Sequence, residues 1–541
     1  MPEVIATRPI APPETPLRTL LGWLSADLHD AAHETVNDPV NDPVNDPVNV
    51  VEDAVITGLS LSSQRIHPGD LYAALPGARA HGASFAADAI ESGAVAVLTD
   101  PDGAALCTDL SVPVIVVDRP RSLMGSLAAR IYGDPAHDLK LVGVTGTHGK
   151  TTTTRLAEGG LQSAGIPAAT VGTVGTRING VEVKTTLTTP EAPDLHALFG
   201  VMKERGVQAC AMEVSSHALV MGRVDGVVFD VAAFTNLGRD HLDFHADVEE
   251  YFAAKKSLFT PERARLGLVN IDDEYGRRLL DEAPIPLRTF SASGSSADWM
   301  ALDVAMLPTG STFTVQGPTG DRFPARVRLT GDFNVANALC AIASLGEAGF
   351  DPAQVANGIS ASAGVPGRLE QVDAGQDFMA IVDYAHKPDA VSAALNALRP
   401  LTNGRLIIVI GAGGDRDLGK RPLMGASAAR LADVLIVTDD NPRSEDPAAI
   451  RAAVLGGAQD VAEPMRAQIL EVGDRREAIR LAVSSAKAGD TVIVAGKGHE
   501  TGQEIDGTVH PFDDRGVLHE ELCNQLGNQL DNQLGEEQAS R

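Results

Sequence analysis

The sequence predicts an α/β protein with three domains, each built around a parallel sheet. The chain has 541 residues, and at about 100 to 200 residues per domain this length suggests three domains. Apolar runs rich in Val, Ile and Ala alternate with helical stretches, which is typical of parallel sheets covered by helices on both faces. The runs are GAVAVLTD (93–100), VPVIVVD (112–118), LKLVGVT (139–145), VQACAMEV (207–214), VVFDVAAFTN (227–236), MAIVDYA (379–385), RLIIVIGAG (405–413), DVLIVT (433–438) and DTVIVAG (490–496).

Two breaks rich in Gly and Pro indicate where the domains meet. GDPAHD (133–138) precedes the run that opens the second domain, and SAGVPGRLE (362–370) precedes the last group of runs. We therefore expect domains at 51–138, 139–365 and 366–525.

Repetitive polar segments lie near both ends of the chain. Three copies of NDPV occupy residues 37–48, and NQLGNQLDNQLG occupies residues 524–535. These segments are too short and too polar to bury an apolar face. We therefore expect flexible tails over residues 1–50 and 526–541.

The composition excludes several classes of protein. The net charge is −28, and nucleic-acid backbones are bound by basic surfaces, so we expect no nucleic-acid partner. The four cysteines are far apart and include no CxxC pair, which argues against a disulfide framework and favours a reduced compartment. Prolines near the N-terminus interrupt any signal-peptide core, and no run of about 18 apolar residues occurs. We expect a cytoplasmic protein without stable membrane association.

The stretch LVGVTGTHGKTTTT is typical of a strand, a glycine-rich loop and a helix that together bind phosphate. In such a site backbone N–H groups face the anion, and a lysine offsets charge on the β- and γ-phosphates. Gly146, Gly149, Lys150 and Thr151 supply these parts. The usual Walker pattern would need glycine where Val144 stands, so the match is to the shorter form GTHGKT. A simple strand-to-helix turn is the alternative, but such a turn has no need for Lys-Thr.

Two polar clusters follow the apolar runs of the second domain. In MEVSSHALVMGRVDG, Glu213 could hold Mg²⁺ and Arg223 could bind a carboxylate or phosphate, whereas His217 could also be a simple helix cap. The next cluster precedes an amphipathic helix, and its spacing fits a hard-metal site only weakly. It contains Asp240, His241, Asp243 and His245, with Lys255 and Lys256 on the helix. For the two lysines, solvated charge is the alternative interpretation.

Two polar loops follow neighbouring runs of the third domain. GAGGDRDLGKRP lacks the spacing of a dinucleotide fingerprint. Arg416, Asp440, Asn441 and Arg443 nevertheless offer both signs of charge, which suits a zwitterionic amino acid better than a plain phosphate. Ordinary polar loops are the alternative.

Taken in order, eleven motifs resemble those of the Mur ligases. They are GTHGKTTTT, LTTP, MEVSSHAL, NLGRDHLDFH, YFAAK, GDFNVANALCA, GRLE, DYAHKPDA, GAGGDRDLGKRP, DDNPR and GKGHE. The resemblance implies an N-terminal domain for a UDP-sugar, a central P-loop ATPase domain and a C-terminal Rossmann-like domain for the incoming amino acid. The DDNPR loop resembles the form that selects meso-2,6-diaminopimelate rather than L-lysine.

The resemblance also implies a reaction. With ATP and Mg²⁺, the family chemistry phosphorylates the D-glutamate carboxylate of UDP-N-acetylmuramoyl-L-alanyl-D-glutamate, and the amine of diaminopimelate then attacks the acyl phosphate. A carboxylate is a poor acyl donor, and phosphorylation gives it a leaving group. The expected partners are these two substrates, and we expect a monomer.

The family roles transfer to positions of this chain that match its motifs. The implied catalytic residues are Lys150, Lys255 and His241. ATP contacts are implied for Gly146, Thr147, His148, Gly149, Lys150, Thr151, Thr152, Asn334 and Arg368. Metal ligands are implied at Thr151, Glu213, His241 and Lys255. Lys255 matches a carbamylated lysine, and a carbamate turns a repelling ammonium into an anionic oxygen ligand, whereas Lys256 has no family role.

The substrate contacts transfer in the same way. The UDP-sugar and muramoyl peptide are implied to contact Leu61, Ser63, Ala78, Arg79, Ala80, Thr188, Thr189, Ser215 and Arg223. Diaminopimelate is implied to contact Arg416, Asp440, Asn441, Pro442, Arg443, Gly496 and Glu500.

The chain departs from the family pattern at two places. The family's LDSR reads Leu61-Ser62-Ser63-Gln64 here, and Met221 stands where relatives can carry glutamine. Three other functions stay open: a lysine-adding sister ligase, a folylpolyglutamate synthetase, and a nucleotide-binding regulatory protein without turnover.

Overall fold

The computed structural model describes residues 5–33, 54–185, 187–238, 240–241, 244–362 and 364–539. The NDPV repeats and Asp243 lie outside these residues. By compactness the chain divides into two units. The first comprises residues 1–300, 317–321 and 339–358, and the second comprises 301–316, 322–338 and 359–541. These units do not follow the expected boundary at 365/366, because residues 301–316, 322–338 and 359–365 are assigned to the second unit.

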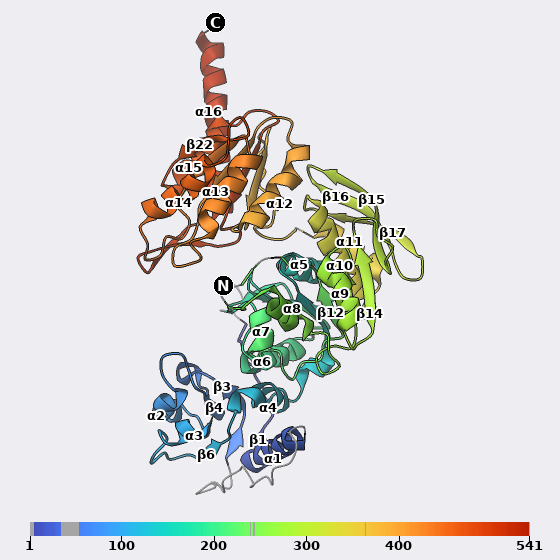
Figure 1. Cartoon of the computed structure of the whole chain (residues 1–541), viewed down its shortest axis with the longest axis vertical. Coiled ribbons are helices and arrows are strands. Elements are labelled where there is room, and N and C mark those ends of the chain that lie inside the picture. The colour runs from blue at the N-terminus through green and yellow to red at the C-terminus, as the bar shows by residue number, and fades with distance from the viewer. Residues whose placement is uncertain are drawn as a thin grey trace. The chain divides into compact units, whose positions relative to one another are not determined.

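The N-terminal part of the first unit contains a four-stranded parallel sheet in the order β3-β4-β5-β6 (Figure 1). Its strands are β3 (Gly58–Ser60), β4 (Asp70–Ala74), β5 (Ala96–Thr99) and β6 (Val114–Val116). Its helices are η1 (Ser63–Arg65), η2 (Gly82–Phe85), α2 (Ala86–Glu91), α3 (Pro101–Ala104), η3 (Pro120–Leu123), α4 (Met124–Ile131) and η4 (Pro135–Asp138).

The predicted N-terminal tail is wrong for part of its length. Strand β1 (Thr15–Pro16) pairs with β2 (Val55–Ile56), and α1 (Leu17–His33) follows. Leu17, Leu20 and Leu24 of α1 are buried in the core beneath the four-stranded sheet. Apolar residues at intervals of three and four form one helical face, so this segment had an apolar stripe to bury.

The segment that precedes β1 also contacts the rest of the first unit. Arg8 pairs with the buried Asp70, with 2.6 Å between Nη1 and Oδ1. The backbone N–H groups of Ile10 and Ala11 each donate to the Glu204 carboxylate at 2.9 Å, and Ile5 is buried in the core of the central sheet. Residues 5–11 therefore contact both the part of the unit that contains the N-terminal sheet and the part that contains the central sheet.

The central sheet of the first unit runs in the order β10-β9-β8-β11-β7-β12-β13-β14, and its core strands are parallel. Its strands are β7 (Lys140–Thr145), β8 (Ala168–Val171), β9 (Thr176–Ile178), β10 (Val181–Val183), β11 (Ala209–Glu213), β12 (Val231–Phe234), β13 (Gly267–Asn270) and β14 (Leu287–Ser291). Its helices are α5 (Lys150–Ser163), α6 (Ala192–Glu204), α7 (Ser216–Val220), α8 (Val248–Lys256) and α9 (Glu274–Glu282). β7, β11 and β12 are adjacent, so the loops that follow them lie at one edge, as expected for a parallel sheet.

The second unit contains a six-stranded sheet in the order β18-β19-β23-β20-β21-β22, in which only the short β18 is antiparallel. Its strands are β18 (Glu370–Gln371), β19 (Met379–Asp383), β20 (Leu406–Ile410), β21 (Val434–Val437), β22 (Gln468–Glu471) and β23 (Thr491–Ala495). Its helices are α12 (Pro388–Leu398), η5 (Arg399–Leu401), α13 (Lys420–Leu431), α14 (Pro447–Gln459), α15 (Arg475–Ser485) and α16 (Asp514–Ala539).

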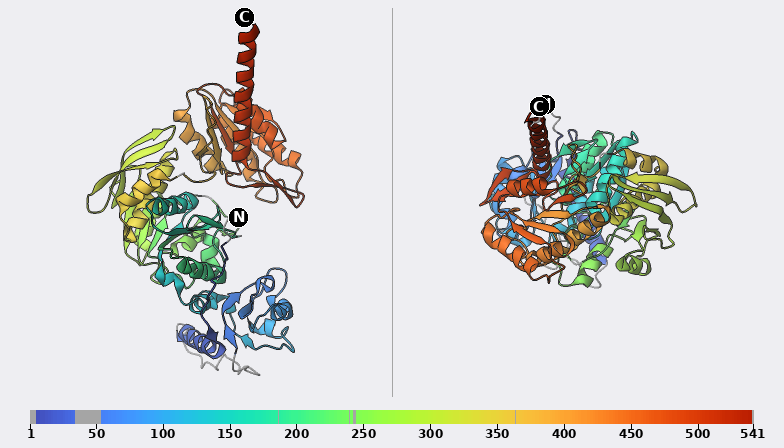
Figure 2. Two further views of the ribbon diagram at one scale, coloured as in Figure 1. Left: turned by 180° about the vertical axis from the view of Figure 1, so that it is seen from behind. Right: turned by 90° about the horizontal axis from the view of Figure 1, so that it is seen from above.

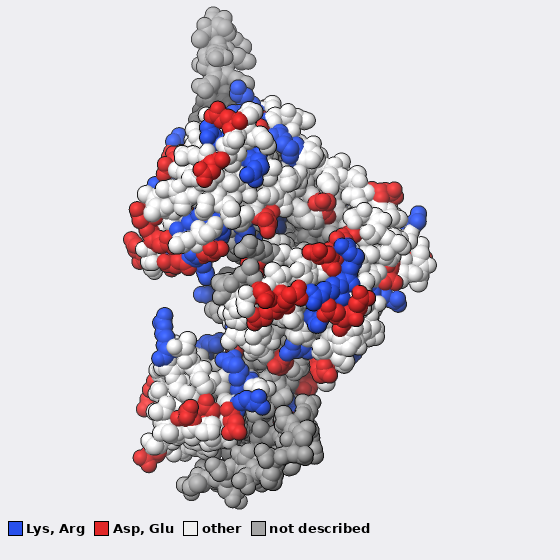
Figure 3. All heavy atoms as spheres, in the orientation of Figure 1, with Lys and Arg blue, Asp and Glu red and all other residues white. Residues whose placement is uncertain are grey.

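The remaining described elements are three strands, two helices and a hairpin. They are β15 (Trp299–Leu307), β16 (Gly310–Gln316), β17 (Arg322–Val327), α10 (Asp332–Glu347), α11 (Pro352–Ala361), and the hairpin of β24 (Gly502–Ile505) and β25 (Thr508–Pro511). None of the helices in the described ranges is both long and apolar enough to span a bilayer. Acidic and basic side chains are interspersed on the face drawn in Figure 3.

The predicted C-terminal tail is helical instead. α16 runs to Ala539 and leaves the body of its own unit as one long helix (Figure 2). Its first part is anchored because Val517, Leu518 and Leu522 are buried against the sheet. The later residues extend a helix that already exists, so they need no new nucleus, and Gln, Leu, Glu and Ala are good helix formers.

Candidate active site

The glycine-rich loop between β7 and α5 is held by the end of β12. The N–H groups of Thr147 and His148 donate to the backbone and side-chain oxygens of Asn236, both at 2.9 Å. Gly146 has φ of +145°, and a Cβ there would lie 1.9 Å from the Thr235 hydroxyl oxygen, so only glycine fits. The loop conformation therefore depends on a neighbouring strand as well as on its own glycines.

Lys150 and Lys255 both reach this loop. The Lys150 Nζ lies 2.7 Å from the Gly146 carbonyl oxygen and 3.1 Å from that of Thr147. The Lys255 Nζ lies 2.9 Å from the same Gly146 oxygen and 4.5 Å from the centre of the Tyr251 ring. Lys255 is only 1% exposed. The structure thus brings these two predicted residues together at the start of α5.

Tyr251 joins the loop to the helix that carries Lys255. Its hydroxyl lies 3.2 Å from the Thr147 Oγ1, which also accepts from the N–H of Gly238 at 2.9 Å. Burial raises the pKa of Tyr251, so the phenol stays protonated and available as a donor. Tyr251 belongs to the YFAAK motif but received no role, although its position four residues before Lys255 places both on one helical face.

Some of the predicted metal ligands suit Mg²⁺ better than others. Glu213 is 1% exposed at the end of β11, opposite Val144 of β7 in register, and it accepts from the Thr173 N–H at 2.7 Å. Mg²⁺ prefers oxygen ligands, which Glu213, Thr151 and a carbamylated Lys255 would offer. Across the described residues, no three His, Cys, Asp or Glu side chains form a metal-binding group. The donor chemistry therefore fits best if Lys255 is carbamylated.

His241 would offer nitrogen rather than oxygen. Its φ is +52°, and its Nε2 lies 3.2 Å from the Asp240 carboxylate. Its ring centre is 4.9 Å from that of His217 and 6.1 Å from that of Tyr251. The sharp backbone turn and the carboxylate together aim the imidazole toward the helix that carries Lys255.

Four predicted contacts to the muramoyl peptide gather at the end of β11. Thr189 is fully buried and donates to the Glu213 carbonyl at 2.9 Å, while Ser215 caps α7. Arg223 donates to the Thr189 carbonyl at 3.4 Å and to the Glu191 carboxylate at 2.8 Å. The remaining member, Thr188, lies beside Thr173, with 3.2 Å between the hydroxyl oxygens.

The predicted UDP-sugar contacts follow the ends of two adjacent parallel strands. Leu61 and Ser63 come directly after β3, and the exposed loop 78–80 follows β4. A bridge between Pro76 and His81 closes that loop. The structure therefore places both groups at one edge of the N-terminal sheet, where ligands of open α/β sheets bind.

Asn334 and Arg368 belong to the second unit, whereas the other predicted ATP contacts belong to the first. The Asn334 amide is 1% exposed and donates to the Thr330 carbonyl at 2.7 Å. The Arg368 guanidinium lies 4.5 Å from the centre of the Tyr384 ring. A role for these two residues in ATP binding stays a prediction.

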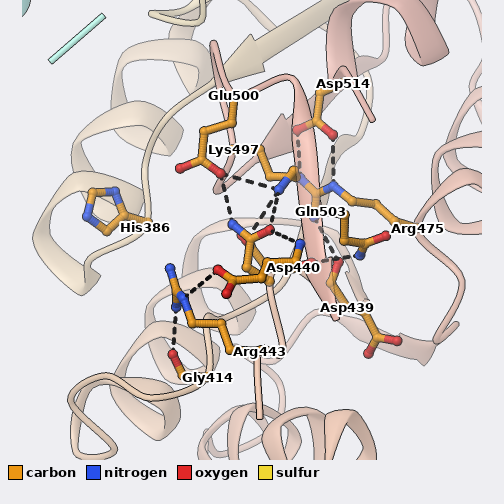
Figure 4. A network of polar contacts seen from close by, with 12 residues as sticks. His386, Gly414, Asp439, Asp440, Arg443, Arg475, Lys497, Glu500, Gln503 and Asp514 are labelled. Carbon is orange, nitrogen blue, oxygen red and sulfur yellow. Dashed lines mark hydrogen bonds and ion pairs between the residues drawn. The ribbon is translucent and has the colours of Figure 1, made fainter. Parts of the chain in front are cut away.

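The predicted diaminopimelate contacts gather at the ends of β20, β21 and β23 in the second unit (Figure 4). Gly496 has φ of +115°, and a Cβ there would lie 2.5 Å from an Asp440 carboxylate oxygen. The Asn441 amide donates to the Glu500 carboxylate at 2.9 Å. Of the remaining members, Pro442 is buried and Arg416 is exposed on the loop after β20.

Arg443 is held in a distinct backbone conformation beside this group. Its φ is +53°, which is uncommon for a residue with a side chain. Its guanidinium donates to the Gly414 carbonyl at 2.6 Å and lies 3.3 Å from the Glu504 carboxylate. The Arg443 side chain therefore already lies beside a carboxylate, that of Glu504.

The motifs did not single out several residues that build this site. Arg475 is fully buried, pairs with Asp514 through two hydrogen bonds of 2.8 and 2.7 Å, and donates to the carbonyls of Asp439 and Ala495 (Figure 4). Burial alone would lower the pKa of Arg475, but Asp514 outweighs it and the pKa is raised. Lys497 was in the quoted GKGHE motif but received no role.

Three segments of the chain match known protein families. These are the Mur ligase middle domain at residues 144–345, the Mur ligase glutamate ligase domain at 367–498, and the Mur ligase family catalytic domain at 55–132.

Similar proteins extend over most of the chain. It is 58% identical over 476 residues to a UDP-N-acetylmuramoyl-L-alanyl-D-glutamate--2,6-diaminopimelate ligase of Streptomyces avermitilis, covering 88% of this chain and 94% of that protein. A protein of the same name from Corynebacterium glutamicum is 49% identical over 489 residues, with coverage of 88% and 94%. A solved structure of a ligase of this name shares 32% identity and a TM-score of 0.63, covering 91% of this chain and 97% of that one.

Proposed function

Because this chain belongs to the Mur ligase family, we propose that it is an ATP-dependent ligase that adds meso-2,6-diaminopimelate to UDP-N-acetylmuramoyl-L-alanyl-D-glutamate. The names of the relatives from Streptomyces avermitilis and Corynebacterium glutamicum support this specificity. The observation that carries the proposal is the gathering of Asp440, Asn441, Arg443 and Glu500 after β21 and β23, the two strands that flank β20. A zwitterionic ligand needs both signs of charge in one place.

The first half of the proposed reaction activates a carboxylate. The D-glutamate carboxylate attacks the γ-phosphorus of ATP, the bond between the β–γ bridging oxygen and that phosphorus breaks, and ADP leaves. Lys150 and the N–H groups at the start of α5 would offset the charge of the transferring phosphoryl group. Mg²⁺, when bound, would offset further phosphate charge, with Thr151, Glu213, His241 and carbamylated Lys255 as its proposed ligands.

The second half forms the amide bond. The diaminopimelate amine attacks the acyl carbon, a tetrahedral intermediate forms, and phosphate leaves as the amine loses a proton. The second unit would orient this amine by binding the other end of the amino acid. Arg443 would pair with the distal carboxylate, replacing its contact with Glu504, and Glu500 would pair with the distal ammonium.

The remaining contacts are part of the same proposal. Leu61, Ser63 and residues 78–80 would contact the UDP-sugar, and Thr188, Thr189, Ser215 and Arg223 the muramoyl peptide. Asn334 and Arg368 would contact ATP. We further propose that the reaction takes place in the cytoplasm.

The decisive experiment is phosphate release by the purified protein with ATP, Mg²⁺ and UDP-N-acetylmuramoyl-L-alanyl-D-glutamate. We expect release only when an amino acid is added, with diaminopimelate giving the tripeptide product by mass spectrometry. Product with L-lysine but not with diaminopimelate would contradict the specificity. Release that depends on folate and glutamate would favour a folylpolyglutamate synthetase, and ATP binding without any acceptor-dependent turnover would favour a regulatory protein.

A further inference from the structure

Lys497 lies two residues after the end of β23 and is 0% exposed. Its Nζ donates to the Asn441 Oδ1 at 2.9 Å and to the Glu500 Oε2 at 3.3 Å, and it lies 3.8 Å from the Asp440 Oδ1 (Figure 4). A buried ammonium is costly unless hydrogen bonds and opposite charge compensate it. All the compensation shown here comes from residues of the proposed amino-acid site.

The ammonium helps to determine which way the Asn441 amide faces. The Asn441 Oδ1 accepts from Lys497 and also from the Glu504 N–H at 3.0 Å, while its Nδ2 donates to the Glu500 Oε2. Turning the amide over would place its NH₂ group against an ammonium and a backbone N–H. Donors would then face donors, so Lys497 and the Glu504 N–H together fix the orientation of Asn441.

The same ammonium lies near two carboxylates that follow β21 and β23, the two strands that flank β20. Glu500 uses one oxygen, Oε2, for both Lys497 and Asn441, and 33% of its side chain remains exposed. Asp440 is 8% exposed on the other side of the ammonium. Without the positive charge, the two carboxylates would repel each other through a poorly solvated region.

The loop that bears Asp440 and Asn441 has a second attachment. Gln503 donates to the Asp440 carbonyl at 2.6 Å, and Arg475 donates to the Asp439 carbonyl at 3.3 Å. These bonds hold backbone atoms, whereas Lys497 contacts only side-chain atoms. Removing the ammonium should therefore leave the loop in place and weaken the hold on the side chains of Asn441 and Glu500.

We propose that Lys497 is a positioning residue that sets Asn441 and Glu500 in the orientation that receives the distal end of the incoming amino acid. It acts through these two side chains and does not itself touch the substrate. This inference rests on the proposed function, because it concerns how the same site selects its amino acid.

The test is the variant Lys497→Met, which keeps the apolar stem and removes the ammonium. We expect the KM for diaminopimelate to rise by about 10- to 100-fold while the KM values for ATP and the UDP-sugar substrate stay within about twofold. Lys487→Met makes the same chemical change at an exposed position of this unit and should behave like wild type. Lys497→Gln, which restores one donor toward Asn441, should recover part of the loss.

A double-mutant cycle separates positioning from general damage. In an Asn441→Ala background, Lys497→Met should raise the KM for diaminopimelate much less than in wild type, because its main target is gone. Additive effects would overturn the inference, as would an unchanged KM or an equal rise in all three KM values. If Lys497→Met does not fold, the same cycle with Lys497→Gln decides the matter. If wild type itself does not use diaminopimelate, the proposed function fails instead.

Discussion

Lys150 and Lys255 donate to one acceptor, the carbonyl oxygen of Gly146, at 2.7 and 2.9 Å. Two ammonium groups at one oxygen repel each other, and more strongly where water is excluded, as it is around the buried Lys255. Carbamylation of Lys255 would remove one of the like charges and place an anion near the other. We therefore expect Lys150 to act as a cation and Lys255, once carbamylated, to act as an anion.

Lys150→Ala should reduce turnover by at least about 100- to 1,000-fold, because the variant loses a charge that stabilises the transferring phosphoryl group. Phosphate release with all substrates present is the measurement, and circular dichroism checks the fold. Activity close to wild type would exclude Lys150 from the phosphate site.

Lys255→Ala should lose most activity and regain part of it when a short-chain carboxylic acid is added, because the acid can replace the carbamate oxygens. Lys256→Ala is the matched control: its ammonium lies 2.7 Å from Glu282 and its side chain is 36% exposed, so we expect little effect. Full activity of Lys255→Ala without any additive would disprove the carbamate role.

Arg443→Ala should raise the KM for diaminopimelate by about 10- to 100-fold, the usual effect of losing a charge-assisted hydrogen bond. The KM for ATP should change little. Arg480→Ala, at a position whose side chain is 61% exposed, controls for the loss of a guanidinium. Equal increases in both KM values would contradict a selective role.

Arg8→Met should destabilise the first unit by about 3 kcal/mol, because the carboxylate of Asp70 would stay buried without its partner. We expect this unit to unfold at a lower urea concentration, with the signal of its tryptophan side chains as the measure of unfolding. Arg18→Met, at an exposed position of α1, should leave the midpoint unchanged. An unchanged midpoint for Arg8→Met would show that the Arg8–Asp70 pair adds no stability.

The first unit should lose stability as the pH falls below about 6.5. Burial lowers the pKa of His196 to about 4, whereas the unfolded chain has an ordinary value of 6.5. Between these values the unfolded state binds more protons than the folded state, so acid favours unfolding, by up to about 3 kcal/mol once the pH reaches 4. Urea midpoints from pH 7 to 4 should fall less steeply in His196→Gln. His137→Gln, at an exposed site, should retain the wild-type slope; equal slopes in all three proteins would contradict this assignment.

Local patterns were enough to predict the α/β class and the glycine-rich loop. A parallel strand buried on both faces must be apolar throughout, and the loop needs glycine at fixed positions, so both leave a mark in consecutive residues. The tails were predicted less well. Leu17, Leu20 and Leu24 form an apolar stripe, but the N-terminal tail was predicted from the NDPV repeats. The C-terminal tail was likewise predicted from its repetitive sequence alone, whereas α16 continues through it.

Residue types and their spacing indicated which side chains could carry the chemistry: the loop lysine, the carboxylates at strand ends and the mixed charges of the DDNPR loop. Which of them lie together depends on how the chain packs. Neighbouring lysines in YFAAKK have the same local pattern, yet Lys255 is buried at the Gly146 carbonyl and Lys256 faces Glu282. Likewise Lys497 lies against Asn441 because β21 and β23 both flank β20. Burial and contacts between distant segments depend on how elements pack, and no local spacing encodes that packing.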